Sequence, residues 1–161
     1  MRSIELHWLS KKEKDITLPN IIFEDGGDYG ACYYSSLKNR EIFYHPEIEI
    51  NGKNHDCTKG LIVINTSTYE ANNEKNYIEN AIAHEWRHHC QKLRNITDEH
   101  FLKLDWLDYK KYKENIIKYF LTYPTEMDAL IYSQRIAPCE TDREWLSWIK
   151  KFKGINKCGL L

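Results

Sequence analysis

One short run of the sequence combines the side chains and the spacing that metal chemistry needs. His84, Glu85 and His88 form the pattern His-Glu-x-x-His within a segment whose apolar residues recur at helical spacing. Residues four positions apart on a helix differ in direction by only about 40°, so the two imidazoles can bind one ion. Glu85 lies about 100° from His84 and can reach a water on that ion without being a ligand. The run predicts a zinc site with Glu85 as general base.

A catalytic zinc ion usually has three protein ligands and one water, so the two histidines need a partner. Glu126 lies in a segment that begins with Pro124, a residue suited to the first turn of a helix. Asp128 is the alternative third ligand. The predicted cofactor is therefore Zn²⁺ held by His84, His88 and Glu126.

These residues also carry a family resemblance. His-Glu-x-x-His at residues 84–88, followed by Glu-x-x-Ala at residues 126–129, resembles the gluzincin branch of the zincin metallopeptidases. The resemblance spans roughly residues 60–132. It implies that the two histidines and Glu126 are the zinc ligands and that Glu85 is the catalytic base.

The resemblance has further implications and two departures. It implies that an edge strand at residues 61–65 binds an extended substrate. Many gluzincins have an aspartate four residues after the glutamate ligand, where it orients the first histidine, but this chain has Leu130 there. Another group must take that role, and Asp128 is one candidate. The residue that stabilises the transition state stays open among Tyr123, Tyr132 and His100.

The predicted activity is hydrolysis of a peptide bond in an extended peptide or protein substrate, by a zinc-bound water that Glu85 activates. A protein that keeps the zincin scaffold for binding or for structure is the alternative, because a fold and a motif do not guarantee turnover. Hydrolysis of a non-peptide amide is a third interpretation. Cleavage preference and oligomeric state are not defined by these residues.

The elements that position these groups differ between the two parts of the chain. Residues 1–65 are rich in Gly, Pro and β-favouring residues, whereas the remainder has long helical periodicities, which predicts an α+β fold. We expect a small mixed or antiparallel sheet packed against the zinc-bearing helix, followed by a mostly helical C-terminal half. Asn51-Gly52 predicts the type I′ turn of a hairpin, and Asn73 is the expected N-cap of the zinc-bearing helix. The other boundaries expected are strands at 4–8, 16–23, 29–35, 41–44, 47–50 and 60–65, the end of the zinc-bearing helix at 94–95, and helices at 98–107, 109–121, 124–135 and 141–152.

Two other groups of metal-capable side chains have simpler interpretations. His89 lies too far round the helix from His84 to share its ion, so we expect it to pack or to make another contact. His55, Asp56 and Cys57 follow the predicted hairpin and are expected to form a turn.

Composition limits the class of protein. A length of 161 residues fits one domain, 1–161, and a formal charge of −1 gives no attraction to nucleic acid or to anionic lipid. The sequence contains no apolar stretch long enough to span a bilayer and no secretory signal. Its five cysteines form no CxxC pair, which favours reduced thiols. We expect a cytoplasmic protein without a membrane or nucleic-acid partner.

Overall fold

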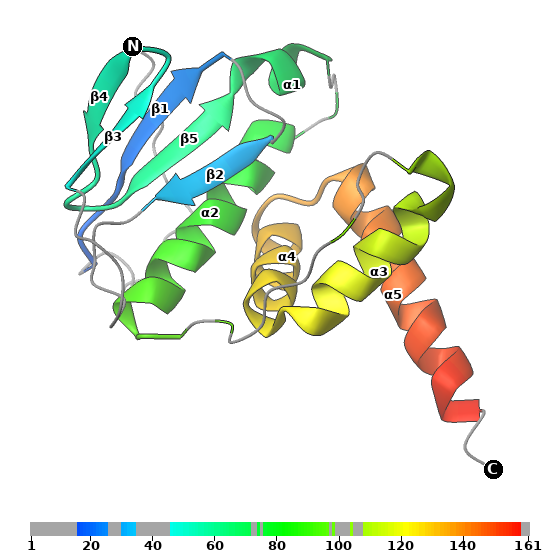
Figure 1. Cartoon of the computed structure of the whole chain (residues 1–161). Coiled ribbons are helices and arrows are strands. Elements are labelled where there is room, and N and C mark those ends of the chain that lie inside the picture. Colours follow the sequence, from blue (N-terminus) through cyan, green and yellow to red (C-terminus); the bar gives the residue numbers. More distant parts are fainter. Residues whose placement is uncertain are drawn as a thin grey trace.

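The computed structural model places a sheet and its covering helix on one side of the molecule and a group of helices on the other (Figure 1). It describes residues 16–25, 30–34, 46–71, 74, 76–96, 98, 104 and 108–158. The predicted α+β class, with a helical C-terminal half, is confirmed.

Three of the strands described form one mixed sheet. These are β1 (Asn20–Glu24), β2 (Ala31–Tyr34) and β5 (Leu61–Asn65), in the order β1-β5-β2. β1 runs parallel to β5 and β2 runs antiparallel to it. β5 is buried along its whole length, because its run of apolar side chains is covered on both faces.

The central position of β5 corrects one expectation. Residues 61–65 were expected to form the edge strand, but they are paired on both sides and cannot accept another strand. Within the described residues the edges of this sheet are β1 and β2 instead. β2 is the edge that lies on the same side as the helical half of the molecule (Figure 1).

A separate hairpin consists of β3 (Glu47–Ile50) and β4 (Lys53–Asp56). Asn51 and Gly52 have φ angles of 52° and 74°, so the predicted two-residue turn with positive φ is confirmed. The expectation that residues 55–57 form a turn is wrong for the first two of them, which belong to β4. The antiparallel pairing with β3 continues along β4 after the turn and places His55 opposite Ile48.

The helices follow the expected periodicity with shifts at their ends. The helix that carries His84 and His88 begins later than expected, because Asn76, with a φ of 66°, is its N-cap and Asn73 lies outside the described residues. A short helix after β5 was not predicted. Strands expected at 4–8 and 41–44 lie outside the described residues, and of the helix expected at 98–107 only Asp98 and Leu104 are described. The helices are α1 (Thr66–Ala71), α2 (Tyr77–Leu93), the 3₁₀ turn η1 (Tyr109–Lys111), α3 (Tyr112–Thr122), α4 (Pro124–Ile136) and α5 (Glu140–Cys158).

None of the helices described has both the length and the apolar character required to cross a bilayer.

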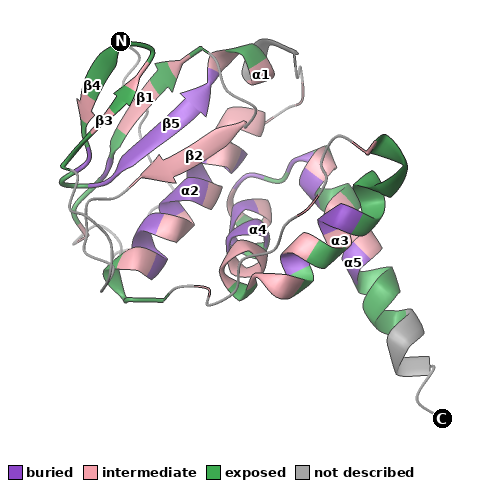
Figure 2. Ribbon diagram, in the orientation of Figure 1, coloured by how far each residue is buried: buried purple, intermediate pink, exposed green. Residues whose placement is uncertain are grey.

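The core is built on the alternation of β5. Ile62 and Ile64 pack against α2, whose Ile82 and Trp86 are buried on the facing side. The opposite face of β5 packs against residues of the hairpin region, including Cys57. A second cluster joins α3, α4 and α5 (Figure 2). α2 therefore lies between the sheet and α4, and one face of it remains available for a site.

Candidate metal centre

The structure brings the three predicted ligands together. His84 Nε2 lies 3.2 Å from one carboxylate oxygen of Glu126, and His88 Nε2 lies 3.4 Å from the other. One donor atom from each residue lies within 4.8 Å of the other two. Ligands held about 2.0–2.1 Å from a tetrahedral zinc ion are themselves about 3.3–3.4 Å apart. Both separations are close to that value, each to a different oxygen of Glu126, so two imidazoles and one carboxylate lie near enough to share one zinc ion.

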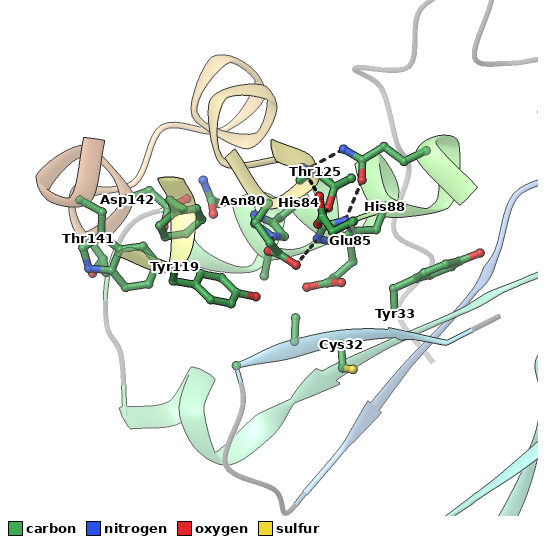
Figure 3. A pocket seen from close by; sticks show the side chains of 18 of the residues that line it. Cys32, Tyr33, Asn80, His84, Glu85, His88, Tyr119, Thr125, Thr141 and Asp142 are labelled. Atoms are coloured by element: carbon green, nitrogen blue, oxygen red, sulfur yellow. Dashed lines mark hydrogen bonds and ion pairs between the residues drawn. The ribbon is translucent and has the colours of Figure 1, made fainter. Parts of the chain in front are cut away.

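The elements that carry the ligands explain why these side chains meet. His84 and His88 lie on adjacent turns of α2, with ring centroids 4.9 Å apart, and Figure 3 shows them side by side. Glu126 lies in the first turn of α4, which begins at Pro124. Asp98 accepts hydrogen bonds from the backbone N–H and the hydroxyl of Thr125 and so stabilises the start of that helix.

Electrostatics keep the ligand carboxylate charged. Burial alone raises the pKa of Glu126, but hydrogen bonds from the two histidines outweigh it and hold this pKa well below its ordinary range. Burial alone lowers the pKa of His88, but the hydrogen bond to Glu126 and the charge of Glu126 raise it, and the net result is a pKa of about 9. In the metal-free chain a proton on His88 therefore balances Glu126. A bound cation can replace that proton.

Glu85 is not among the three grouped ligands and lies between them and β2 (Figure 3). Its side chain is buried, with an exposed fraction of 8%. Burial raises the pKa of Glu85. The charges of the two histidines partly offset this increase, and the charge of Glu126 adds to it. A carboxyl whose pKa lies above its usual value is suited to both accepting and returning a proton near neutral pH.

Asp128, the alternative third ligand, is engaged elsewhere. Arg87 Nε donates to one of its oxygens at 2.6 Å and Arg87 Nη2 to the other at 3.1 Å. Gln91 Nε2 donates to it at 2.8 Å. The structure therefore groups Glu126, and not Asp128, with the histidines.

Tyr119 is a cleft residue that sequence reasoning missed. It lies near the end of α3, its hydroxyl makes a hydrogen bond to Glu126, and Figure 3 shows it pointing into the cleft beside His84 and Glu85. Burial is the largest cause that raises the pKa of Tyr119, followed by the charge of Glu126, and Glu85 adds to the rise. The phenol is therefore neutral across the physiological range. Only the turn at Tyr123 separates α3 from α4, so these ends meet by chain geometry that no local pattern signals.

Tyr123 and Tyr132, two of the three candidates for stabilising the transition state, do not line the cleft that holds the histidines. Tyr132 is buried in the core cluster, and the guanidinium carbons of Arg87 and Arg135 lie 5.2 and 5.4 Å from its ring centroid. The ring of Tyr123 lies 5.0 Å from that of Tyr119. His100 lies outside the described residues.

A buried carboxylate from α5 faces His84. Asp142 accepts a hydrogen bond from Ser133 Oγ at 3.3 Å and another from Asn80, and its charge interacts with His84. Figure 3 shows Asn80 and Asp142 on the side of His84 that is away from His88. Leu130 is fully buried in the core, so the carboxylate near His84 comes from a distant segment.

These groups line one cleft of about 670 Å³. Residues 30–33, at the start of the edge strand β2, form one wall, and the histidines and Glu85 on α2 form the floor. Tyr119 and Trp145 line the side made by the C-terminal helices. A volume of this size accommodates a small ligand or a few residues of an extended chain.

Comparison of the chain with protein-family models, with curated proteins and with solved structures gave no match. The resemblance to the gluzincins rests on the motif residues of the sequence.

Proposed function

We propose that this chain is a zinc-dependent hydrolase, and specifically a gluzincin-like metallopeptidase. The observation that carries the proposal is the grouping of His84, His88 and Glu126, with one donor atom of each within 4.8 Å of the others and the buried carboxyl of Glu85 beside them. The edge strand β2 borders the same cleft. Metal ligands, a base and a strand that can bind an extended chain therefore adjoin one another.

The chemistry divides between the ion and the protein. A zinc ion at this site supplies a water of lowered pKa and polarises the substrate carbonyl. The carboxylate of Glu85 accepts the proton from the attacking water and passes it to the leaving amine. Burial of Glu85 supports this role, because it raises the pKa of this carboxyl toward the pKa values of the water and the amine between which Glu85 moves the proton.

We assign the stabilisation of the developing oxyanion to Tyr119. Its hydroxyl lies at the ligand carboxylate and near Glu85, on the opposite side of the cleft from β2. A neutral phenol can donate to a developing negative charge, which an ionised one cannot do.

The substrate proposed is an extended peptide segment bound along β2. This strand pairs with β5 on one side only within the described residues. Its backbone can therefore form a further ladder with an added strand, which places a peptide carbonyl above the floor of the cleft. β2 replaces residues 61–65 in this role.

Cys32, Cys57, Cys90 and Cys139 are free thiols. They support the proposal that the protein works in the reducing cytoplasm.

The test is peptide cleavage that depends on Glu85. Zinc-loaded protein is incubated with a digest of a whole proteome, and new termini are identified by mass spectrometry. We expect cleavage by the wild type and by Glu79→Gln, a matched control whose side chain is exposed on the same helix, and a rate at least about 100-fold lower for Glu85→Gln. Chelation should abolish cleavage and added zinc should restore it. A zinc-loaded wild type that cleaves nothing would instead favour a zincin scaffold used for binding.

A further inference from the structure

Gln91 connects a ligand of the metal centre to the helix that carries another ligand. Gln91 lies three residues after His88 on α2 and is buried, with an exposed fraction of 4%. Its side-chain Oε1 lies 2.9 Å from His88 Nδ1. Its Nε2 donates to the backbone carbonyl of Thr125 at 2.9 Å and to Asp128 Oδ2 at 2.8 Å. A single amide therefore bonds to both α2 and α4.

The partners of this amide determine its orientation. The carbonyl of Thr125 and the ionised carboxylate of Asp128 can only accept hydrogen bonds, so the group that faces them must be the NH₂ of Gln91. Its Oε1 then faces His88 Nδ1, and this nitrogen must carry a proton. Nε2 of His88 is left as the nitrogen that can bind a metal, and it is the nitrogen that faces Glu126.

The carboxylate that holds Gln91 is itself fixed in position. Both oxygens of Asp128 accept from the guanidinium of Arg87, a paired geometry that restrains a carboxylate in its plane. The guanidinium carbon of Arg87 also lies 5.2 Å from the ring centroid of Tyr132, which is buried. The acceptor of Gln91 is thus anchored to the core.

Thr125 precedes Glu126 in the first turn of α4, and Asp128 lies just beyond that turn. The two bonds donated by Gln91 hold this turn against α2. Removal of the amide would free the ring of His88 to rotate and would loosen the turn that carries the third ligand.

We propose that Gln91 is a positioning residue of the metal centre, which sets the tautomer of His88 and the place of Glu126 with one side chain. This inference rests on the proposed zinc site, and it concerns metal affinity and not turnover. Loss of a group that orients a metal ligand typically weakens metal binding 10-fold to 100-fold.

The variant that tests it is Gln91→Met, which keeps the length of the side chain and removes its hydrogen bonds. The matched control is Gln134→Met on α4, since Gln134 Nε2 also donates to a backbone carbonyl, that of Cys139 at 3.0 Å, but touches no ligand. Zinc affinity is measured by competition with a chromophoric chelator, and the melting temperature of the metal-free protein is recorded in parallel.

We expect Gln91→Met to bind one zinc about 10-fold to 100-fold more weakly than the wild type, and Gln134→Met to bind it as the wild type does.

Several results would overturn the inference. One is equal zinc affinity in Gln91→Met and the wild type, with only the melting temperature lowered, which would indicate a structural role. Another is a nitrogen NMR spectrum of the zinc-loaded wild type in which His88 binds through Nδ1, a measurement that needs no variant. A wild type that binds zinc without cleaving peptides would contradict the proposed enzyme but leave Gln91 in its role, whereas a wild type that binds no zinc overturns both.

Discussion

Replacement of Tyr119 by Phe removes a single hydroxyl from the cleft. The ring keeps its place, because it packs against the rings of Phe120 and Tyr123 with centroids 5.3 and 5.0 Å away. The hydroxyl itself interacts with Glu126, and Glu85 lies close enough to influence its pKa. The substitution therefore separates the role of the donor from the role of the aromatic ring.

Two magnitudes distinguish a catalytic hydroxyl from a structural one. Loss of one donor to an oxyanion reduces kcat by about 10²-fold to 10³-fold, or about 2.7–4 kcal/mol. Because Tyr119 and His84 are only half-buried, water reaches the cleft, and we expect the lower end, about 10²-fold. Loss of the hydrogen bond to Glu126 alone costs about 1 kcal/mol of stability, which lowers the melting temperature by about 2–4 °C in a chain of this length.

The assay is steady-state hydrolysis of a peptide identified from the digest, with zinc affinity and the melting temperature measured on the same samples. We expect Tyr119→Phe to lose about 10²-fold in kcat, with KM and zinc affinity changed less than about threefold. Tyr109→Phe, at an exposed position of the 3₁₀ turn η1, is the matched control. An unchanged kcat in Tyr119→Phe, or a loss entirely accounted for by weaker zinc binding, would refute the assignment.

Three further predictions concern pH and stability. Folding raises the pKa of the Glu85 carboxyl, so the folded state of the metal-free wild type loses stability as pH rises through that pKa. Metal-free Glu85→Gln should therefore have a higher melting temperature than the wild type near pH 8 but not near pH 4, and thermal melts at the two pH values check this. Zinc binding must displace the proton of His88, whose pKa is about 9, so the apparent zinc affinity should rise about tenfold per pH unit up to that value. Zinc affinity that does not change between about pH 6 and pH 8 would contradict this prediction. Gly60 has a φ of 88°, and a Cβ there would lie 2.8 Å from His89 Nδ1 and 2.9 Å from the Tyr33 hydroxyl, which bond to each other at 2.8 Å. Gly60→Ala should therefore cost about 2–3 kcal/mol and lower the melting temperature by about 4–12 °C without changing zinc stoichiometry.

The parts of the site that depend on local spacing could be predicted from the sequence. His84 and His88 share a helix face because they are four residues apart, and the apolar positions between them define that helix. Pro124 indicated the start of α4 and, with it, the direction of Glu126. Gln91 could have been found in the same way, because a residue three positions after His88 lies on the same face.

The parts that depend on pairing between distant segments could not be predicted. The apolar run at residues 61–65 indicated burial on both faces, which is typical of an interior strand, but its neighbours at β1 and β2 come from segments with no signal for their order. Asp142 approaches His84 across more than fifty residues of sequence. Tyr119 and Glu126 meet because the chain turns at Tyr123 between α3 and α4, and these helices pack with α5 in one cluster, which neither helix signals alone.

The central claim is that His84, His88 and Glu126 hold one zinc ion, and metal content measured by plasma mass spectrometry tests it. The protein is compared, after removal of any affinity tag, with His84→Ala, Glu126→Ala, Asp128→Ala and Glu85→Gln. We expect about one zinc per chain in the wild type, in Glu85→Gln and in Asp128→Ala, none in His84→Ala, and weakened retention in Glu126→Ala. A wild type that holds no zinc after incubation with the metal, or an Asp128→Ala variant that loses zinc while Glu126→Ala keeps it, would contradict the site described.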